Sequence, residues 1–150
     1  MSKIPEGFHT ITPSIIVKNG SAAIDLYNRA LGAEEMGRIL LPGSDKIMHA
    51  CLQIGSSKLF LYDENPEKGM LAPEGGKGGA SFYVYVDDVD ASHQQALTAG
   101  MSEISPPDDM FWGDRMSIVQ DEYGHTWSLA AHERDVTQEE MMAAIAEMES

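Results

Sequence analysis

The segment FWGDRMSIVQDEYGHTWSL, residues 111–129, contains both tryptophans of the chain and two turn signals in one short run. The dipeptide GD at 113–114 lies between a strand that ends in aromatic residues and a strand over 115–120. The tetrapeptide DEYG at 121–124 then turns the chain into a strand over 125–131. The segment therefore predicts a β-meander, in which successive antiparallel strands are joined by tight turns.

Hydrophobic periodicity predicts the same order of elements twice along the chain. The first module is predicted as a strand over 10–17, a helix over 22–30 that ends at Gly32, and strands over 35–41, 46–54 and 58–63. The second is predicted as a strand over 81–87, a helix over 88–99, and strands over 101–104, 115–120 and 125–131. A capping box at Thr137–Glu140 begins a final helix that extends to Met148. The predicted fold class is α+β, with two βαβββ modules and a C-terminal helix.

We expect residues 1–150 to form a single domain, because a chain of 150 residues with 43% hydrophobic side chains can bury one sizeable core. Its expected parts are a first module at 8–64, a linker at 65–79, a second module at 80–132 and a C-terminal helix at 133–150. The linker contains the cluster GGKGG at 75–79. Phosphate-binding loops also place glycines beside a lysine, but their spacing and their Ser or Thr are missing here, which favours a linker.

The two modules align at a constant offset, since 86 − 17, 114 − 45, 115 − 46 and 124 − 55 all equal 69. The aligned pairs are a hydrophobic anchor, a turn acid, a base and a turn glycine: Val17 with Val86, Asp45 with Asp114, Lys46 with Arg115, and Gly55 with Gly124. Such a repeat indicates that one structural unit occurs twice. One helix cannot cover both faces of a sheet, so we expect the modules to pair into a curved sheet with a concave groove where a ligand binds.

The chain carries 24 acidic and 10 basic side chains, which gives a formal charge of −14. A phosphate backbone or an anionic membrane surface would be repelled, so we expect no nucleic acid and no membrane as partners. No apolar run approaches the roughly 20 residues that span a bilayer, and the N-terminus lacks a signal-peptide pattern, so we expect a cytoplasmic protein. Cys51 is the only cysteine, which rules out an intrachain disulfide.

Several short motifs resemble one known family. They are AIDLY at 23–27 followed by LGA at 31–33, MHA at 48–50, FWGDR at 111–115 and DEYGHTWSL at 121–129. Together with the paired modules they resemble the vicinal oxygen chelate superfamily, and within it the glyoxalase, bleomycin-resistance and extradiol dioxygenase-like proteins of the PhnB-like branch. The resemblance implies the fold, whereas isomerases, dioxygenases, thiol transferases and plain binding proteins all use this scaffold.

In metal-using members, the resemblance implies four ligands on the concave face, one from the first and one from the last strand of each module. Alignment on Val17, Val86 and Gly124 places three of these positions at Thr12, Ser81 and Ser128, and the repeat offset places the fourth at Leu59. Hydroxyl and alkyl groups are poor metal ligands compared with imidazole or carboxylate. We therefore expect no metal and no cofactor at the family position.

His49 is the only candidate catalytic residue that the pattern suggests. Strand alternation places it on one face with Ile47, Cys51 and Gln53, the more polar face of its strand. Its imidazole could act as a general acid or base. The alternative, a hydrogen-bonded core histidine, is favoured because no second catalytic group is near it in sequence. Cys51 is expected to be a small buried filler rather than a nucleophile.

Trp112 and Arg115 flank the turn at the rim of the predicted sheet. Arg115 can hold a carboxylate or a phosphate bidentately while Trp112 supplies a flat apolar wall, which suits a planar ligand with an anionic or polar tail. The alternative for Arg115 is a contact with Asp114 or with the backbone that fixes the hairpin. Tyr83 shares its face with Ser81. The predicted ligand-binding residues are Thr12, Ser81, Tyr83, Trp112, Arg115 and Ser128.

Two functions remain open at this point. The first is a metal-free binding protein of the bleomycin-resistance kind that holds a small apolar or aromatic molecule, and the missing metal ligands favour it. The second is a lyase, isomerase or dioxygenase-like enzyme that uses a relocated metal or His49. We also expect a homodimer, because the run MMAAI at 141–145 is too apolar for an isolated exposed helix.

Overall fold

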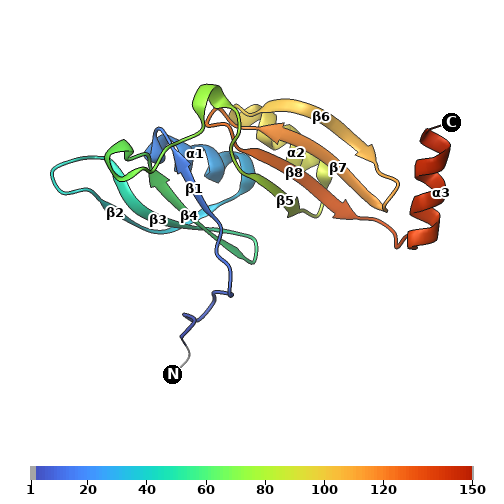
Figure 1. The fold of residues 1–150 in the computed structure, drawn as a ribbon, viewed down its shortest axis with the longest axis horizontal. Coiled ribbons are helices and arrows are strands. Elements are labelled where there is room, and N and C mark those ends of the chain that lie inside the picture. The colour runs from blue at the N-terminus through green and yellow to red at the C-terminus, as the bar shows by residue number, and fades with distance from the viewer. Residues whose placement is uncertain (1–2, 150) are drawn as a thin grey trace. The chain divides into compact units, whose positions relative to one another are not determined.

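The computed structural model describes residues 3–149. The chain divides into two compact units, each with its own sheet and helix (Figure 1). Unit 1 runs to Ala80 and also contains Glu122–His125, and unit 2 contains Ser81–Asp121 and the chain from Thr126 onward. Each unit is a βαβββ module, so the predicted α+β class with two such modules is confirmed.

Unit 1 consists of β1 (Ser14–Val17), α1 (Gly20–Leu31), β2 (Glu34–Leu40), β3 (Ile47–Ile54) and β4 (Ser57–Asp63). The sheet order is β1-β4-β3-β2, with β1 parallel to β4 and the other pairs antiparallel. Two short 3-10 helices, Pro66–Lys68 and Glu74–Gly76, lie in the predicted linker.

Helix α1 forms where the sequence predicts it because both of its ends are capped. The Asn19 side chain accepts a hydrogen bond from the Ala22 N–H, and Gly32 ends the helix in the left-handed conformation. Its apolar face packs on one side of the sheet, and the buried residues of the two layers are Ala23, Ile24, Leu26, Tyr27 and Ala30 of α1 with Ile15, Val17, Ala50, Leu52 and Leu61 of the strands. Each large side chain buried this way contributes about 1.5–3 kcal/mol.

Unit 2 consists of β5 (Ser81–Tyr85), α2 (Val89–Ala99), β6 (Ser102–Asp109), β7 (Asp114–Gln120), β8 (Thr126–His132) and α3 (Gln138–Met148). Its sheet order is β5-β8-β7-β6, the same arrangement as in unit 1. Helix α2 covers one face of this sheet (Figure 1). On that face Trp127 is 1% exposed, its ring lies 4.6 Å from the Phe82 ring, and its Nε1–H donates to Asp121 at 2.9 Å.

The first strand is shorter and the strand β6 longer than the sequence predicts. Strand β1 begins at Ser14 rather than at Thr10, after Pro13, which has no N–H for a ladder but accepts from the Phe60 N–H at 2.9 Å. Strand β6 continues to Asp109 through two prolines because it is an edge strand, where one side needs no partner, and its pairing with β7 shifts register twice.

Phe111 and Trp112 lie in a turn and not at the end of a strand, so that part of the predicted meander is wrong. The Gly113 N–H donates to the Met110 carbonyl at 3.1 Å, and the Met110 N–H donates to the Asp114 carbonyl at 2.7 Å. Gly113 has φ +101°, a conformation that side chains other than glycine rarely adopt. The tight turn therefore ends β6 before the aromatic pair.

His125 is also outside the strand predicted for it, because the turn Glu122–His125 packs within unit 1. The Ala80 N–H donates to His125 Nδ1 at 2.9 Å, and His125 Nε2–H therefore donates to the Ile16 carbonyl at 3.0 Å. A Cβ on Gly79 would lie 2.5 Å from the Gly124 carbonyl oxygen. The glycines at this end of the predicted linker thus permit close backbone packing.

Helix α3 begins with the predicted capping box. The Glu140 N–H donates to Thr137 Oγ1 at 3.1 Å, and Thr137 Oγ1 donates to the Glu140 carboxylate at 3.1 Å. In the described part of the chain, α3 packs against no other helix or strand, and Figure 1 shows it standing apart from the strands of its unit. Among residues 3–149, no helix combines the length and the apolar character needed to cross a membrane.

Candidate ligand-binding site

The face of the unit 2 sheet that α2 does not cover carries most of the predicted binding residues. Strand pairing sets Tyr83 beside Ser128 and Ser81 beside Thr126, and alternation turns these side chains away from α2. Tyr85 follows on the same face, 67% exposed, with its ring 5.4 Å from the Tyr83 ring. We call this surface the helix-free face of unit 2.

A chain of hydrogen bonds connects the side chains at one edge of this face. Tyr83 donates its hydroxyl proton to Asp114 Oδ2 at 2.7 Å, and Trp112 Nε1–H donates to the Tyr83 oxygen at 3.2 Å. His132 Nδ1 lies 2.8 Å from Asp114 Oδ1, and His132 Nε2 lies 2.7 Å from Asp135 Oδ1. Both ring nitrogens thus face carboxylates, and this arrangement favours the imidazolium form of His132, in which both nitrogens carry a proton.

The pKa values of the chain follow from these contacts. Burial of Asp114, which is 5% exposed, favours its neutral form, but the hydrogen bonds from Tyr83 and His132 outweigh it and the pKa of Asp114 is lowered. The pKa of His132 is raised, first by its bond to Asp135 and then by its bond to Asp114. Burial and then the bond to Asp114 raise the pKa of Tyr83, so its phenol stays protonated at neutral pH.

Arg115 points to the opposite face of the sheet, and the structure does not bring it together with Tyr83 and Trp112. Its Nε and Nη2 donate to the two carboxylate oxygens of Asp90 in α2, at 2.8 and 2.9 Å, and its Nη1 donates to Asp109 in β6 at 3.2 Å. A structural role was the favoured alternative, but the partners are Asp90 and Asp109 rather than Asp114. The guanidinium links β7 to α2 and to β6, and its pKa is raised by these two carboxylates.

A buried histidine also lies on the side of α2 that faces the sheet. His93 Nδ1 is 2.8 Å from the Ser117 hydroxyl, and His93 Nε2 is 2.7 Å from the Glu103 carboxylate. Serine, histidine and an acid in a chain are the residue types of a hydrolase triad. Ser117 is fully buried, however, so no substrate reaches its hydroxyl, and the chain of bonds serves to hold α2 on the sheet.

In unit 1 the face of the sheet opposite α1 is aromatic. The His49 ring lies 4.7 Å from Phe60 and 5.4 Å from Tyr62, and among residues 3–149 it has no hydrogen-bond partner. Ile47 does not share this face as predicted, because β3 has an extra residue at Met48 relative to β2 and Ile47 turns to the buried side. The structure thus gives His49 apolar neighbours and no acid–base partner.

Thr12 precedes β1 and lines a cavity of about 250 Å³ in unit 1. Leu59, the fourth position from the repeat offset, is 4% exposed in strand β4. Ser14 and Tyr83 are equivalent at the offset of 69, and they pair with Phe60 and Ser128, respectively. The offset between the last strands of the two modules is therefore 68 (128 − 60), so the position equivalent to Ser128 is Phe60 and the assignment of Leu59 is wrong. Phe60 pairs with Cys51 and Ser128 pairs with Ile118, so the offset is already 67 (118 − 51) in the preceding strands, and the constant offset is lost before the last turn of each module.

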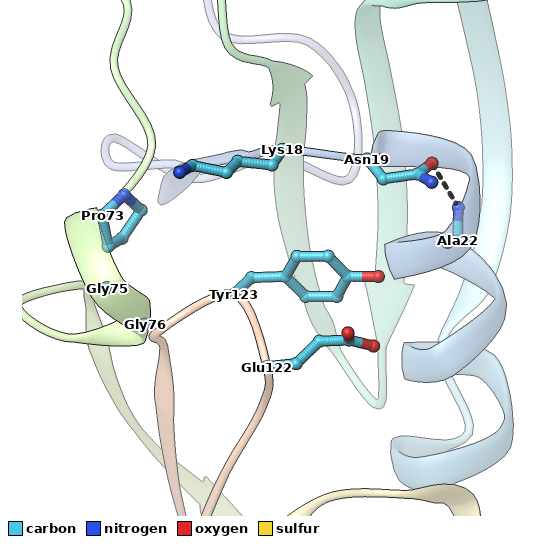
Figure 2. A pocket seen from close by; sticks show the side chains of 8 residues that line it. All are labelled: Lys18, Asn19, Ala22, Pro73, Gly75, Gly76, Glu122 and Tyr123. Carbon is cyan, nitrogen blue, oxygen red and sulfur yellow. Dashed lines mark hydrogen bonds between the residues drawn. The ribbon is translucent and has the colours of Figure 1, made fainter.

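A larger cavity of about 400 Å³ lies beside the start of α1 in unit 1. Figure 2 shows Lys18 and Asn19 on the chain that enters the helix, Glu122 and Tyr123 on the β7–β8 turn, and Pro73 at the glycine-rich segment. A lysine and a glutamate both line it, so it is not a simple anion-binding cradle. It contains none of the predicted ligand-binding residues.

The comparisons with known proteins agree with this architecture. A sequence model of the Glyoxalase/Bleomycin resistance protein/Dioxygenase superfamily matches residues 7–129. The chain belongs to this superfamily. An uncharacterized protein of Mycobacterium bovis is 37% identical over 141 residues, which cover 91% of each chain. An uncharacterized protein of Mycobacterium tuberculosis is also 37% identical over 141 residues, which cover 91% of this chain and 82% of that protein.

Several solved structures are similar to this chain as well. TioX from Micromonospora sp. ML1 is 26% identical with a TM-score of 0.67, over 83% of this chain and 98% of that chain. A protein from Pseudomonas aeruginosa is 28% identical with a TM-score of 0.64, over 84% of this chain and 99% of that chain. A glyoxalase/bleomycin resistance protein/dioxygenase from Nocardioides, at 22% identity and a TM-score of 0.65 over 87% of each chain, shows the shared fold.

In this superfamily member the predicted metal positions in unit 2 are hydroxyl side chains, Ser81 and Ser128, on the helix-free face. Within residues 3–149, no three His, Cys, Asp or Glu side chains are grouped so that they could hold a metal ion. Sequence reasoning missed Asp114 and His132 as site residues. The register of the β7–β8 hairpin could have identified these two residues, because pairing Gln120 with Thr126 across the turn places Asp114 opposite His132.

Proposed function

We propose that the protein binds a small aromatic or apolar molecule against the helix-free face of unit 2, and that binding requires no metal ion. The observation that carries this proposal is the pair Tyr83 and Tyr85, which stand side by side with 43% and 67% of their surfaces exposed. Exposed aromatic rings offer a large contact area and lose little conformational entropy on binding. Trp112 supports the site by its hydrogen bond to Tyr83.

The hydrogen bonds of Tyr83 give the surface a defined geometry. Its hydroxyl is fixed by Asp114 on one side and Trp112 on the other, so the ring is held in position before a ligand arrives. A ligand then pays less ordering entropy than it would at mobile side chains. This arrangement favours a binding protein of the bleomycin-resistance kind, and the sequence motifs favour the PhnB-like branch.

The metal-free part of the proposal rests on residue types. Thr12, Ser81 and Ser128 offer only neutral hydroxyls where the family's metal ligands are expected, and a catalytic metal needs about three protein ligands of the imidazole, thiolate or carboxylate type. The alternative of a metal-dependent enzyme needs a relocated site. His49, its first candidate, has only aromatic ring contacts in the described residues.

The experiment is an NMR titration with 2-phenylethanol, a neutral aromatic probe, in the presence and absence of EDTA. We expect amide shifts at 81–85 and 111–114, and the same affinity with the chelator. The double variant Tyr83→Ala/Tyr85→Ala should lose binding, whereas Leu71→Ala, which removes an exposed side chain in unit 1, should retain it. Loss of binding with EDTA, together with a stoichiometric metal in elemental analysis, would support the enzyme alternative.

We also propose that the chain forms a homodimer through α3 and acts in the cytoplasm, where the lone Cys51 stays reduced. Met141, Ala144, Ile145 and Met148 follow the helical spacing i, i+3, i+4, i+7 and form an apolar stripe. Ile145 and Met148 are 39% and 63% exposed, since α3 packs on no other element in the described residues. A second copy of the chain would bury this stripe.

A further inference from the structure

The hydrogen-bond donors around Tyr83 are already used within the protein. The Tyr83 proton goes to Asp114, the Trp112 N–H goes to the Tyr83 oxygen, and the two N–H groups of His132 go to Asp114 and Asp135. A phenol has one proton and two lone pairs. The Tyr83 oxygen therefore meets a ligand as a hydrogen-bond acceptor, and the ligand has to supply the proton.

The charge at this edge is negative. Asp114 and Asp135 carry two negative charges, and His132 adds one positive charge when it is protonated, so the net charge is negative in either state. The Arg115 guanidinium, which could have attracted an anion, is held on the opposite face by Asp90 and Asp109. An anionic tail on the ligand would thus meet an edge whose net charge is negative.

The whole of unit 2 adds to this effect. It contains two arginines and no lysine against 14 acidic side chains, a formal charge of −12 (2 − 14), whereas the whole chain carries −14. A surface with such an excess of one sign concentrates ligands of the opposite sign. The exposed faces of Tyr83 and Tyr85 also favour a cation, because the π-electron face of an aromatic ring is negative.

We infer that the ligand of the helix-free face is an aromatic or apolar molecule that carries a protonated amine, whose N–H groups bond to the Tyr83 oxygen at the edge held by Asp114. This inference rests on the proposed function and names the chemical class of its ligand. It reverses the expectation of an anionic tail, which depended on Arg115 reaching the site.

Three probes with one ring and one linker test the inference: 2-phenylethylamine as the cation, 2-phenylethanol as the neutral compound and 3-phenylpropionate as the anion. NMR titrations at neutral pH and physiological salt give the three affinities from the amides at 81–85 and 111–114. We expect the amine to bind about tenfold more tightly than the carboxylate, because a charge-assisted hydrogen bond and a cation–π contact favour it.

Variants separate this site from the general negative charge of the protein. Tyr83→Phe keeps the ring and removes the oxygen, and Asp114→Asn removes the local charge; both should reduce the preference for the amine over the alcohol by about threefold or more. Glu139→Gln on α3 removes one charge elsewhere in unit 2 and should leave the preference unchanged. If Asp114→Asn does not fold, Tyr83→Phe decides alone.

Two results would overturn the inference while the proposed function stands. In the first, 2-phenylethanol binds and 3-phenylpropionate binds as tightly as the amine. In the second, the preference for the amine is the same in Tyr83→Phe as in Glu139→Gln. Binding of none of the three probes would overturn both the inference and the proposed function. Loss of the preference in Tyr83→Phe, with 2-phenylethanol still bound, supports both.

Discussion

At the scale of single residues, Asp114 and Arg115 show how strand alternation places two adjacent charged side chains on opposite faces of a sheet, where they have different partners. Asp114 points to the helix-free face, where it accepts from Tyr83 and His132. Arg115 points to α2, where the Asp90 carboxylate accepts from its Nε and Nη2. A sequence motif that contains both residues suggests one site, but the pleat of the strand places them on opposite sides.

His132 gives a prediction about pH. Its folded-state pKa is raised above the ordinary value of 6.5, first by Asp135 and then by Asp114. Its contribution to stability is therefore fully present below pH 6.5 and is lost as the pH rises through the raised pKa. Urea unfolding of the wild type and of His132→Asn across this range should show a difference in unfolding free energy that shrinks with rising pH.

The control is His9→Asn, an exposed histidine in unit 1. The difference between the wild type and this variant should change little over the same pH range. A wild-type advantage over His132→Asn that stays constant with pH, or grows as the pH rises, would contradict the bridging imidazolium.

At the scale of elements, the turn from Met110 to Gly113 fixes the binding edge, because it carries Trp112 and leads directly into Asp114. The Gly113 carbonyl accepts from the N–H groups of Glu133 and Arg134, which ties this turn to the segment after β8. The position of Trp112 thus depends on how closely the backbones approach at Gly113.

Gly113→Ala should destabilise the protein by about 2 kcal/mol or more and should also weaken binding of 2-phenylethanol. The added Cβ would lie 2.1 Å from the Arg134 carbonyl oxygen, and φ is +101°. The matched control is Gly100→Ala in the same unit, with φ +118° and no atom within 4 Å of the added Cβ. If urea unfolding gave equal losses for the two variants, the close approach at Gly113 would not matter.

At the scale of the whole molecule, the unpacked helix α3 predicts self-association. The wild type should sediment as a dimer at micromolar concentration. The triple variant Met141→Gln/Ile145→Gln/Met148→Gln should sediment as a monomer, because it lacks the apolar side chains that dimerisation would bury. Circular dichroism of both proteins checks that the helix itself is retained.

The control for this prediction is Met36→Gln/Ile39→Gln, which removes exposed apolar side chains from the edge strand β2. This variant should remain a dimer. A monomeric wild type would refute the dimer, and dissociation of the β2 variant alone would move the interface from α3 to the edge of the unit 1 sheet.

The sequence by itself determined the two βαβββ modules and their helix caps. Asn19, Gly32 and Thr137 act on backbone groups within a few residues, so the local pattern was sufficient for α1 and α3. The faces of β5 and β8 were also predictable, because alternation is a property of each strand. For the same reason Tyr83 was correctly assigned to the face of Ser81.

Only the tertiary structure decided which side chains meet. The bond of Tyr83 to Asp114 joins positions 31 residues apart, and the bond of Arg115 to Asp90 joins positions 25 residues apart. Such contacts depend on register and on the placement of α2, and a shift of one residue in the register reverses the face of a side chain, as Leu59 shows. The sequence therefore predicted which residues could bind a ligand, and the strand register decided which of them share one surface.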